Sequence, residues 1–419
     1  MSDVLLILWI AFIGSDRIDL AGGHGPFILT PFLALTPLVM IAEAVRRRQM
    51  RHPIVLSRGA VAYAAAAAAL LGIAVTSTFF SGEFVVSAPR CMLLVAQVVG
   101  TLAVAVLAAD RDDIGRILAR GALVSLPFFL VFDVMEALWW IGRAAEMIRL
   151  GPVSIRFDGL QNAGLIPRLA GTVGDGNRAG FVLLFYLVLI ARGERVAWLR
   201  RVGLTLGFLL IAATISRSTT LAVVATGAVL VLERRRPPSM RVIAAAALVL
   251  AAACALVLVQ PRLIDRVESL ASSPLAQRLS TKEGSAQSHL ALIGRGIDEA
   301  TQSVPRALIG LGYGNSYLVL QDVFPGNRYG NFHSIYVTMF AECGAFALLL
   351  ILMIMGTPLL VGGPWRALIA GCFAFNLFYQ TTAEPTFWFV LAVSWLAMPL
   401  LPLSVSAARG TPRPQYHRS

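Results

Sequence analysis

Three short polar segments of the sequence carry side chains that could bind an anion and move a proton. The first is the segment 328–350, where a stretch rich in Gly and Asn ends in His333 and turns directly into an apolar run. Imidazole is the side chain whose ordinary pKa best suits proton transfer near neutral pH. A helix N-terminus offers free N–H donors to an anion. The position of His333 therefore predicts a catalytic role toward a charged substrate.

Two arginines stand in the other two segments. Arg168 precedes a glycine-rich stretch, and Arg217 lies in SRST between two apolar runs. An arginine at a membrane edge is costly unless it reaches water or holds an anion, and its planar guanidinium suits phosphate oxygens. We therefore predict that Arg217 and Arg168 bind a diphosphate. Arg295 and Arg306, in the long segment before His333, are further candidates for this role.

Supporting residues surround these positions. Asn177 stands where a side chain would cap the helix expected over 178–192. Tyr336 and Glu342 follow in the apolar run after the histidine, and we expect them to pack or hydrogen-bond within that helix. Residues 285–302 have the serines and spacing of a capped amphipathic helix. It contains His289, the one other histidine that we assign to the site.

The composition places these segments in a membrane protein. The chain has 419 residues, of which 57% are hydrophobic and 14% charged, and its mean hydropathy is +0.75, far from the values of soluble domains. A helix needs about 20 residues to cross a bilayer. We predict an all-α bundle of about twelve transmembrane helices, over residues 3–20, 22–42, 59–80, 91–109, 121–142, 178–192, 202–216, 218–232, 242–260, 334–360, 367–383 and 386–404.

Basic loops orient this bundle, because short connections rich in Lys and Arg stay on the cytoplasmic side. Such clusters follow the second, sixth and eighth predicted spans. Both termini are therefore predicted to be cytoplasmic, with a long outer loop at 143–177. The predicted organisation is nine helices within 1–260, a large outer loop subdomain over 261–333, three helices within 334–404 and a cytoplasmic tail over 405–419.

The remaining composition argues against other partners. The net charge is +12, but the arginines occupy separate loops beside the membrane, which favours contact with lipid headgroups and excludes a continuous nucleic-acid surface. The four cysteines lie in or beside apolar runs without the spacing of a disulfide framework or zinc site. No carboxylate cluster for a divalent metal stands on the predicted outer face, so we predict a metal-independent reaction without a cofactor.

Together the three segments resemble the O-antigen ligase and polysaccharide polymerase superfamily. They read RLAGTVGDGNRAG at 168–180, ISRST at 215–219 and FHSIYVTMFAECG at 332–344. The resemblance implies a bacterial inner-membrane transferase that acts on glycans linked to undecaprenyl diphosphate, at the outer face. It implies that Arg217 and an arginine of the large loop bind the lipid diphosphate. His333 would act near the acceptor, which is a glycan or the lipid A core. The family often has Arg at the start of the loop helix, where this chain has His289.

Other functions share parts of this pattern. A transporter or lipid-linked glycan flippase would also be a bundle of about twelve helices, usually with inverted repeats and ionisable residues at the midplane. Asp133 and Glu136 are the obvious intramembrane acids here, and no repeat is visible. A peptidoglycan-type polymerase fits the segment around His333 less well. Polymerase, ligase and protein O-glycan transferase differ in their acceptors and stay open, with polymerase slightly favoured because more surface polysaccharide systems need one.

Overall fold

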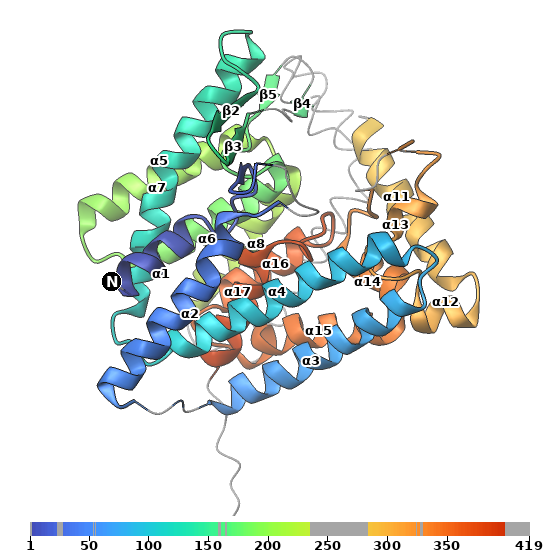
Figure 1. The fold of residues 1–419 in the computed structure, drawn as a ribbon, viewed down its shortest axis with the longest axis horizontal. Helices are drawn as coiled ribbons and strands as arrows, with labels where there is room; N and C mark the ends of the chain where they lie inside the picture. The colour runs from blue at the N-terminus through green and yellow to red at the C-terminus, as the bar shows by residue number, and fades with distance from the viewer. Residues whose placement is uncertain are drawn as a thin grey trace, which may run out of the picture.

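The structure is a computed structural model that describes residues 2–22, 28–52, 54, 56–157, 161–163, 166–234, 284–323, 325–326 and 330–398. Most of these residues are helical (Figure 1). The predicted span 242–260, the tail 405–419 and the large loop before residue 284 lie outside the described residues. The helices are α1 (Ser2–Ala11), α2 (Pro31–Met50), α3 (Arg58–Phe79), α4 (Phe84–Ala108), α5 (Ile114–Trp140), α6 (Gly176–Gly193), α7 (Ala197–Thr214), α8 (Arg217–Arg234), α11 (Gly284–Thr301), α12 (Val304–Ile309), α13 (Ser316–Val319), α14 (Ile335–Cys343), α15 (Ala345–Val361), α16 (Arg366–Phe375) and α17 (Pro385–Leu396).

Short strands accompany the helices, so the expected all-α class holds for the bundle but not for its loop at 143–177. Strand β3 (Val153–Arg156) pairs antiparallel with β2 (Met147–Leu150) on one edge and with β1 (Ile18–Asp19) on the other. A second antiparallel pair consists of β4 (Gln161–Ala163) and β5 (Ile166–Arg168). The second pair ends at Arg168 and leads directly into the first predicted arginine segment.

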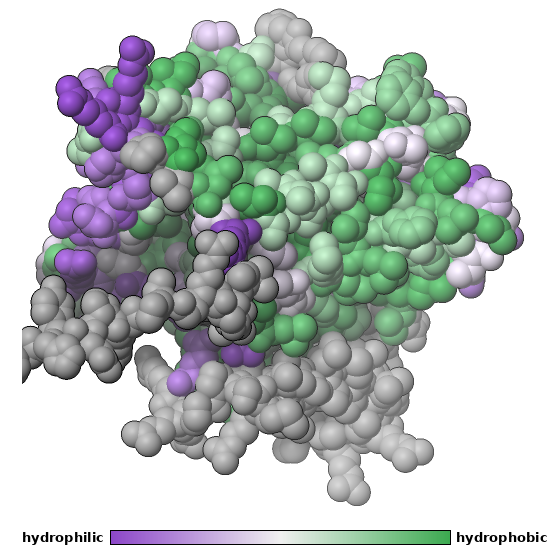
Figure 2. Space-filling view, turned by 90° about the horizontal axis from the view of Figure 1, so that it is seen from below, coloured by the Kyte–Doolittle hydropathy of each residue, from purple (hydrophilic) through white to green (hydrophobic). Residues whose placement is uncertain are grey.

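The described helices have the apolar character of membrane spans. Five of them, α3 to α7, are long and apolar enough to cross a membrane, and α1, α15, α16 and α17 are shorter apolar helices. Seen from below, the molecule presents a broad apolar face (Figure 2), and exposed side chains such as Val61 of α3 and Leu349 of α15 are hydrophobic. Such a face suits hydrocarbon better than water. A multi-pass membrane protein is supported, while the number of twelve spans stays a prediction.

Several predicted spans differ from the observed helices in their ends: α2 lies eight to nine residues later than the predicted 22–42, α4 and α5 begin seven residues earlier than predicted, and α16 ends at Phe375, eight residues before the predicted 383. Two further predicted spans are interrupted in the structure. The span expected at 3–20 ends as a helix at Ala11, and the chain then turns so that Arg17 lies 2.6 Å from the Glu136 carboxylate of α5. The span expected at 334–360 is divided at Gly344 into α14 and α15. At both interruptions, backbone groups form hydrogen bonds between a loop and another part of the chain. The N–H groups of Asp16 and Arg17 donate to the Thr172 carbonyl, and a loop before α14 donates to the carbonyls at the end of that helix.

The division at Gly344 has its cause in the loop before the helix. The N–H groups of Leu311 and Gly312 each donate at 2.9 Å to carbonyls in the last turn of α14. Gly344 has φ of +84°, and a Cβ at this position would lie 2.1 Å from the carbonyl oxygen of Leu308. The loop therefore satisfies carbonyls that a continuous helix would use, and only glycine fits at the break.

Glu342 fixes the same loop, and the expectation that its side chain bonds within its own helix is wrong. The carboxylate accepts hydrogen bonds from the N–H of Gly314 at 2.7 Å and from the N–H and hydroxyl of Ser316 at 3.1 and 2.5 Å. Glycines 310, 312 and 314 of this loop all take positive φ, a conformation that glycine adopts without steric cost. The loop subdomain is thereby tied to the membrane helices at α14.

Helix α6 forms the centre of the bundle, and every residue from Phe181 to Ile190 is buried. Its first turns lie directly beside α8. A Cβ at Gly180 would lie 2.1 Å from the hydroxyl oxygen of Thr219, so the two helices can approach this closely only because position 180 is glycine. This packing brings the starts of α6 and α8, and hence the two arginine segments, to the same place.

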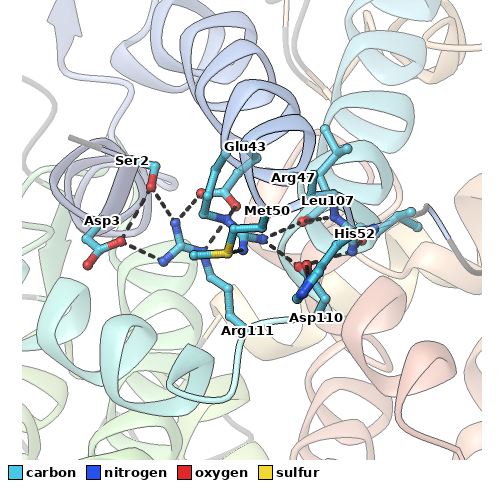
Figure 3. A network of polar contacts seen from close by, with 11 residues as sticks. Ser2, Asp3, Glu43, Arg47, Met50, His52, Leu107, Asp110 and Arg111 are labelled. Carbon is cyan, nitrogen blue, oxygen red and sulfur yellow. Dashed lines mark hydrogen bonds and ion pairs between the residues drawn. The ribbon is translucent and has the colours of Figure 1, made fainter.

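A network of charged side chains joins the ends of α1, α2 and the turn between α4 and α5 (Figure 3). Arg111 lies 2.6 Å from both Glu43 and Asp3, and Arg46 lies 2.8 Å from Glu43 and 2.5 Å from Asp110. The Glu43 side chain is fully buried. Because a buried carboxylate is stable only when paired, these contacts hold the four helix ends together.

Replacing Arg111 with methionine is expected to lower the free energy of unfolding by roughly 3 kcal/mol, since Glu43 then keeps its charge in a buried place with one cation fewer. The measurement is denaturant unfolding of the purified protein in detergent micelles. The matched control is Arg116→Met, because Arg116 is 44% exposed and lies 3.6 Å from Asp113, and such pairs contribute less than about 1 kcal/mol. Equal losses in the two variants would contradict the assignment.

Candidate active site

The structure brings the three polar segments together around one helix of the loop subdomain. Burial, followed by the neighbouring charges of His333, Arg217 and Arg168, lowers the pKa of His289 to about 4, while the Asp175 carboxylate acts in the opposite direction. The five side chains therefore share one local electrostatic environment. They come from α11, the turn before α14, α8, β5 and the start of α6.

His333 is fixed through its backbone. Its φ is +53°, which is uncommon outside glycine, and its N–H donates to the side-chain oxygen of Asn331 at 2.9 Å. The N–H of Ile335 donates to the carbonyls of Asn376 and Tyr379 at 3.2 and 3.1 Å. The turn that carries the imidazole is thus bound to the connection between α16 and α17.

The imidazole of His333 packs between two rings. It stacks on the ring of His289 with centroids 4.1 Å apart and planes 28° apart, and the ring of Tyr379 meets it edge-on at 6.2 Å. Burial lowers the pKa of His333, and the nearby Asp175 carboxylate opposes this. A histidine with a lowered pKa is neutral at neutral pH and is able to accept a proton.

Asn177 joins the two arginine segments. Its side-chain oxygen accepts hydrogen bonds from Arg168 and from the Ser216 hydroxyl, both at 2.8 Å. Arg168 also donates through Nε to the carbonyl of Thr214 at 3.0 Å. The guanidinium is therefore held at the junction of α6, α7 and α8. Ser216, which shares the Asn177 acceptor, directly precedes Arg217 in sequence.

Only Ile215 and Ser216 connect α7 to α8. Ile215 has φ of +47° and ends α7, and the Ser216 hydroxyl oxygen accepts the N–H of Thr219 at 3.1 Å, as a helix-capping serine does. Arg217 is the first residue of α8. This geometry places an arginine beside the positive end of a helix dipole, an arrangement that favours an anionic ligand.

The residue that caps α6 differs from the prediction. Asp175, not Asn177, caps this helix, and its carboxylate accepts the N–H groups of Asn177 and Arg178 at 2.8 and 3.1 Å. The helix begins at Gly176, two residues earlier than predicted, and the residue that caps it is therefore also two residues earlier. A side-chain hydrogen bond also joins Asp175 to Tyr379. Sequence reasoning gave neither of these two residues a role in the site.

The chain between Arg168 and α6 is anchored by the two buried acids of α5. Asp133 accepts the N–H of Gly171 at 2.8 Å, and Glu136 accepts the N–H of Ala170 at 2.9 Å. Gly171 has φ of +57°, and a Cβ there would lie 2.3 Å from the ring of Phe129. The acids of α5 therefore serve to shape the arginine segment.

Arg178 helps to hold the segment between Arg168 and α6 in place. Its guanidinium lies 2.5 Å from Asp16 and 2.9 Å from Glu384, and Asp16 also accepts the N–H of Gly174 at 2.6 Å. The side chain thus links α6 to the chain after α1 and to the start of α17. Because two carboxylates surround it, Arg178 is assigned to the framework and not to anion binding.

Three of the predicted residues lie elsewhere. Arg295 lies 2.6 Å from Asp322, and Arg306 lies 3.7 Å from Glu299, on exposed parts of the loop subdomain. No contact in the described part of the chain joins either arginine to His333, so their phosphate role stays a prediction. Tyr336 donates to the carbonyl of Phe373 in α16 at 3.2 Å, a packing contact between helices and not within its own helix.

The arrangement can bind an anion and accept a proton side by side. Two guanidinium groups and the N-terminal end of α8 supply positive charge, and the adjacent neutral imidazole supplies a base. Among the described residues, no group of three or more His, Cys, Asp and Glu side chains is placed to hold a metal ion. Cys91, Cys343 and Cys372 are free and buried. Cys254 lies outside the described residues.

Comparison with known proteins confirms the resemblance seen in the motifs. Residues 202–352 match the family model of the O-antigen ligases. This segment contains Arg217, His289 and His333, and it ends before α16 and α17. No curated protein matches the chain. The match indicates a membrane-embedded glycan transferase of the ligase and polymerase type.

Proposed function

We propose that this protein, whose segment 202–352 matches the O-antigen ligase family, is an inner-membrane glycosyltransferase. It transfers or polymerises undecaprenyl-diphosphate-linked oligosaccharide at the outer face of the membrane. The observation that carries the proposal is the set of contacts that joins the three segments. His289 stacks on His333, and the His333 ring meets Tyr379, which is hydrogen-bonded to the Asp175 cap of α6. Two residues further on, Asn177 binds Arg168 and the serine that precedes Arg217. The acceptor is a second glycan or the lipid A core.

The proposed reaction assigns one task to each group. An acceptor hydroxyl attacks the anomeric carbon of the lipid-linked sugar, a new C–O bond forms, and the bond from that carbon to the diphosphate oxygen breaks. The hydroxyl proton passes to His333 as general base. Arg168 and Arg217 stabilise the negative charge that develops on the leaving lipid diphosphate. Asn177 holds Arg168 in place for this task.

The direction of the helices supports an outward-facing site. Arg111 precedes the first turn of α5, and Asp133 near its other end binds the arginine segment. At 1.5 Å per residue these positions lie roughly 33 Å apart, about the thickness of the hydrocarbon core. The charged network at the first end includes arginines of α2, and the excess of basic residues belongs inside. The site then faces outward.

A transporter or flippase fits the same contacts less well. Such a protein needs ionisable groups that change partners as the two sides open in turn. The two acids of α5 are instead bound to backbone N–H groups of the site segment, and Glu43 and Arg111 lock the opposite end. These contacts favour a fixed bundle that presents a reactive site.

Metal independence follows from the proposed chemistry, in which arginines stabilise the leaving group. We expect that EDTA, added to the purified enzyme with its lipid-linked substrate, changes the rate of transfer by less than about twofold. Added Mg²⁺ is expected to give no increase over the EDTA-treated sample. A rate that EDTA abolishes and Mg²⁺ restores would assign charge stabilisation to a metal ion and contradict this part of the proposal.

The experiment for the function supplies purified protein, in proteoliposomes, with undecaprenyl-diphosphate-linked repeat units. One sample contains only the donor, and a second also contains lipid A core. Ladders of longer lipid-linked glycan in the first sample identify a polymerase, whereas glycan found only on lipid A core identifies a ligase. If the donor is unchanged in both samples and reaches the opposite leaflet faster than in empty vesicles, the transporter replaces the transferase.

A further inference from the structure

The loop helix α11 lies against α14 through one face. His289, Leu292 and Gly296 are spaced by three and four residues, which places them on the same side of a helix. Leu292 is buried in a cluster with Phe332, the residue before the catalytic histidine. A Cβ at Gly296 would lie 2.4 Å from Val337 and 2.7 Å from the Phe332 ring. The backbone of α11 is therefore held close to the turn that carries the base.

This close packing determines what covers the ring of His333. The His289 ring lies 4.1 Å away and nearly parallel, so it shields one face of the imidazole from water. The charged groups that face the histidine pair come from the other elements around it: Arg217 at the start of α8, Arg168 at the end of β5 and Asp175 at the cap of α6. The titratable side chain of Tyr379 also meets the His333 ring, and these are the groups that face the histidine pair among the residues that the structure describes.

The two rings interact through charge as well as through contact, since the charge of His333 lowers the pKa of His289. A proton on His333 would place a cation against the His289 ring, and burial removes the water that would stabilise a charge on either ring. Burial lowers the pKa of both histidines. A stacked neutral partner therefore suits a base that must stay unprotonated, whereas an arginine at position 289 would instead bring a permanent charge.

We propose that His289 is a positioning residue that covers His333, holds its ring in a fixed orientation and keeps it neutral, so that it works as a base at mildly acidic pH. This inference rests on the proposed transferase function. His289 acts through the ring of His333 and is not assigned a contact with the reacting atoms. Because His289 lies on α11, the packing of the loop subdomain against α14 also affects whether His333 stays neutral.

The test compares the pH dependence of transfer in wild type, His289→Ala and His289→Phe. In His289→Ala water reaches the base, its proton affinity rises, and we expect the acidic limb of the profile to move to higher pH. The rate at pH 6 relative to pH 8.5 then falls by about threefold or more. His289→Phe keeps a stacked, uncharged ring and is expected to retain the wild-type limb. Equal profiles in the three proteins would overturn the proposal.

The contact at Gly296 gives a second test that leaves both histidines intact. Gly296→Ala must push α11 away from α14, because the added Cβ has no room, and we expect it to move the acidic limb as His289→Ala does. Gly294→Ala is the matched control on the same helix, since a Cβ there meets nothing within 4 Å. A shift in both glycine variants, or in neither, contradicts the proposed role of α11.

A readout without activity separates this inference from the proposed function. The rate at which diethylpyrocarbonate modifies His333 is followed by mass spectrometry at pH 7. We expect modification to be several-fold faster in His289→Ala than in wild type and unchanged in His289→Phe. If wild type transfers no glycan but the three proteins show these relative modification rates, the proposed function fails and the covering role of His289 stands. Equal modification rates in wild type and His289→Ala would overturn the covering role, whatever the activity.

Discussion

Replacing His333 with asparagine is expected to reduce the turnover of glycan transfer by about 10²- to 10⁴-fold, the usual contribution of a positioned general base. Asparagine is suited to this test because it tolerates the left-handed backbone conformation better than most residues, and His333 has φ of +53°. The turn before α14 should therefore keep its shape. The substitution removes the only group at this place that the proposed reaction uses as a proton acceptor.

The measurement is single-turnover transfer by purified protein in proteoliposomes, with substrate binding followed separately. We expect binding of the lipid diphosphate to change by less than about threefold, since the arginines remain. His52→Asn is the matched control, because that histidine is 52% exposed and lies beside Asp110 in the charged network at the other end of the bundle. A His333→Asn protein with near wild-type turnover would remove the general base from the mechanism.

The fold could be predicted from the sequence where apolar length alone decides it. The spans expected at 59–80 and 218–232 agree with α3 and α8 within about two residues, because a long apolar run has no better partner than a helix. The break at Gly344 could not be predicted in this way. It depends on loop backbone from residues 308–312 that binds carbonyls of α14, and a tertiary contact of this kind leaves no periodic signal.

The sequence allowed the residue types of the site to be predicted, but not which of these residues contact one another. His333, Arg217 and Arg168 stand out because charge at a membrane edge is expensive, and the structure joins their segments through Tyr379, Asp175 and Asn177. Arg295 and Arg306 have the same side chain but sit beside carboxylates on exposed surface, which sequence spacing cannot reveal. The stacking of two histidines 44 positions apart depends on how α11 packs on α14.

The roles of the acids illustrate the same limit. Asp133 and Glu136 look like a transport pathway in the sequence, because carboxylates inside an apolar run usually mark function. In the structure they bind backbone N–H groups of Ala170 and Gly171. Which interpretation applies depends on whether a loop returns into the bundle at that depth. No local property of α5 contains this information.

Replacing Arg168 or Arg217 with glutamine is expected to lower kcat/KM by about 10²- to 10³-fold each, the loss typical when a donor to a developing negative charge is removed. Both arginines face the same proposed diphosphate, so the double variant should lose less than the product of the two single losses. The variants are compared in the same proteoliposome assay at saturating and limiting donor. Arg116→Gln, which changes an exposed arginine in the first turn of α5, serves as the control.

Lysine at the same positions tests geometry apart from charge. Arg168 donates through Nε to the Thr214 carbonyl and through Nη2 to Asn177, and a lysine cannot make both bonds in these directions and still reach a phosphate oxygen. Arg168→Lys is therefore expected to lose at least about tenfold in kcat/KM although it keeps the positive charge. Asn177→Ala should reproduce part of this loss, since it removes the acceptor that orients the guanidinium. Full activity in both variants would mean that Arg168 contributes only its charge, and the fixed junction of α6, α7 and α8 would then have no part in binding the leaving group.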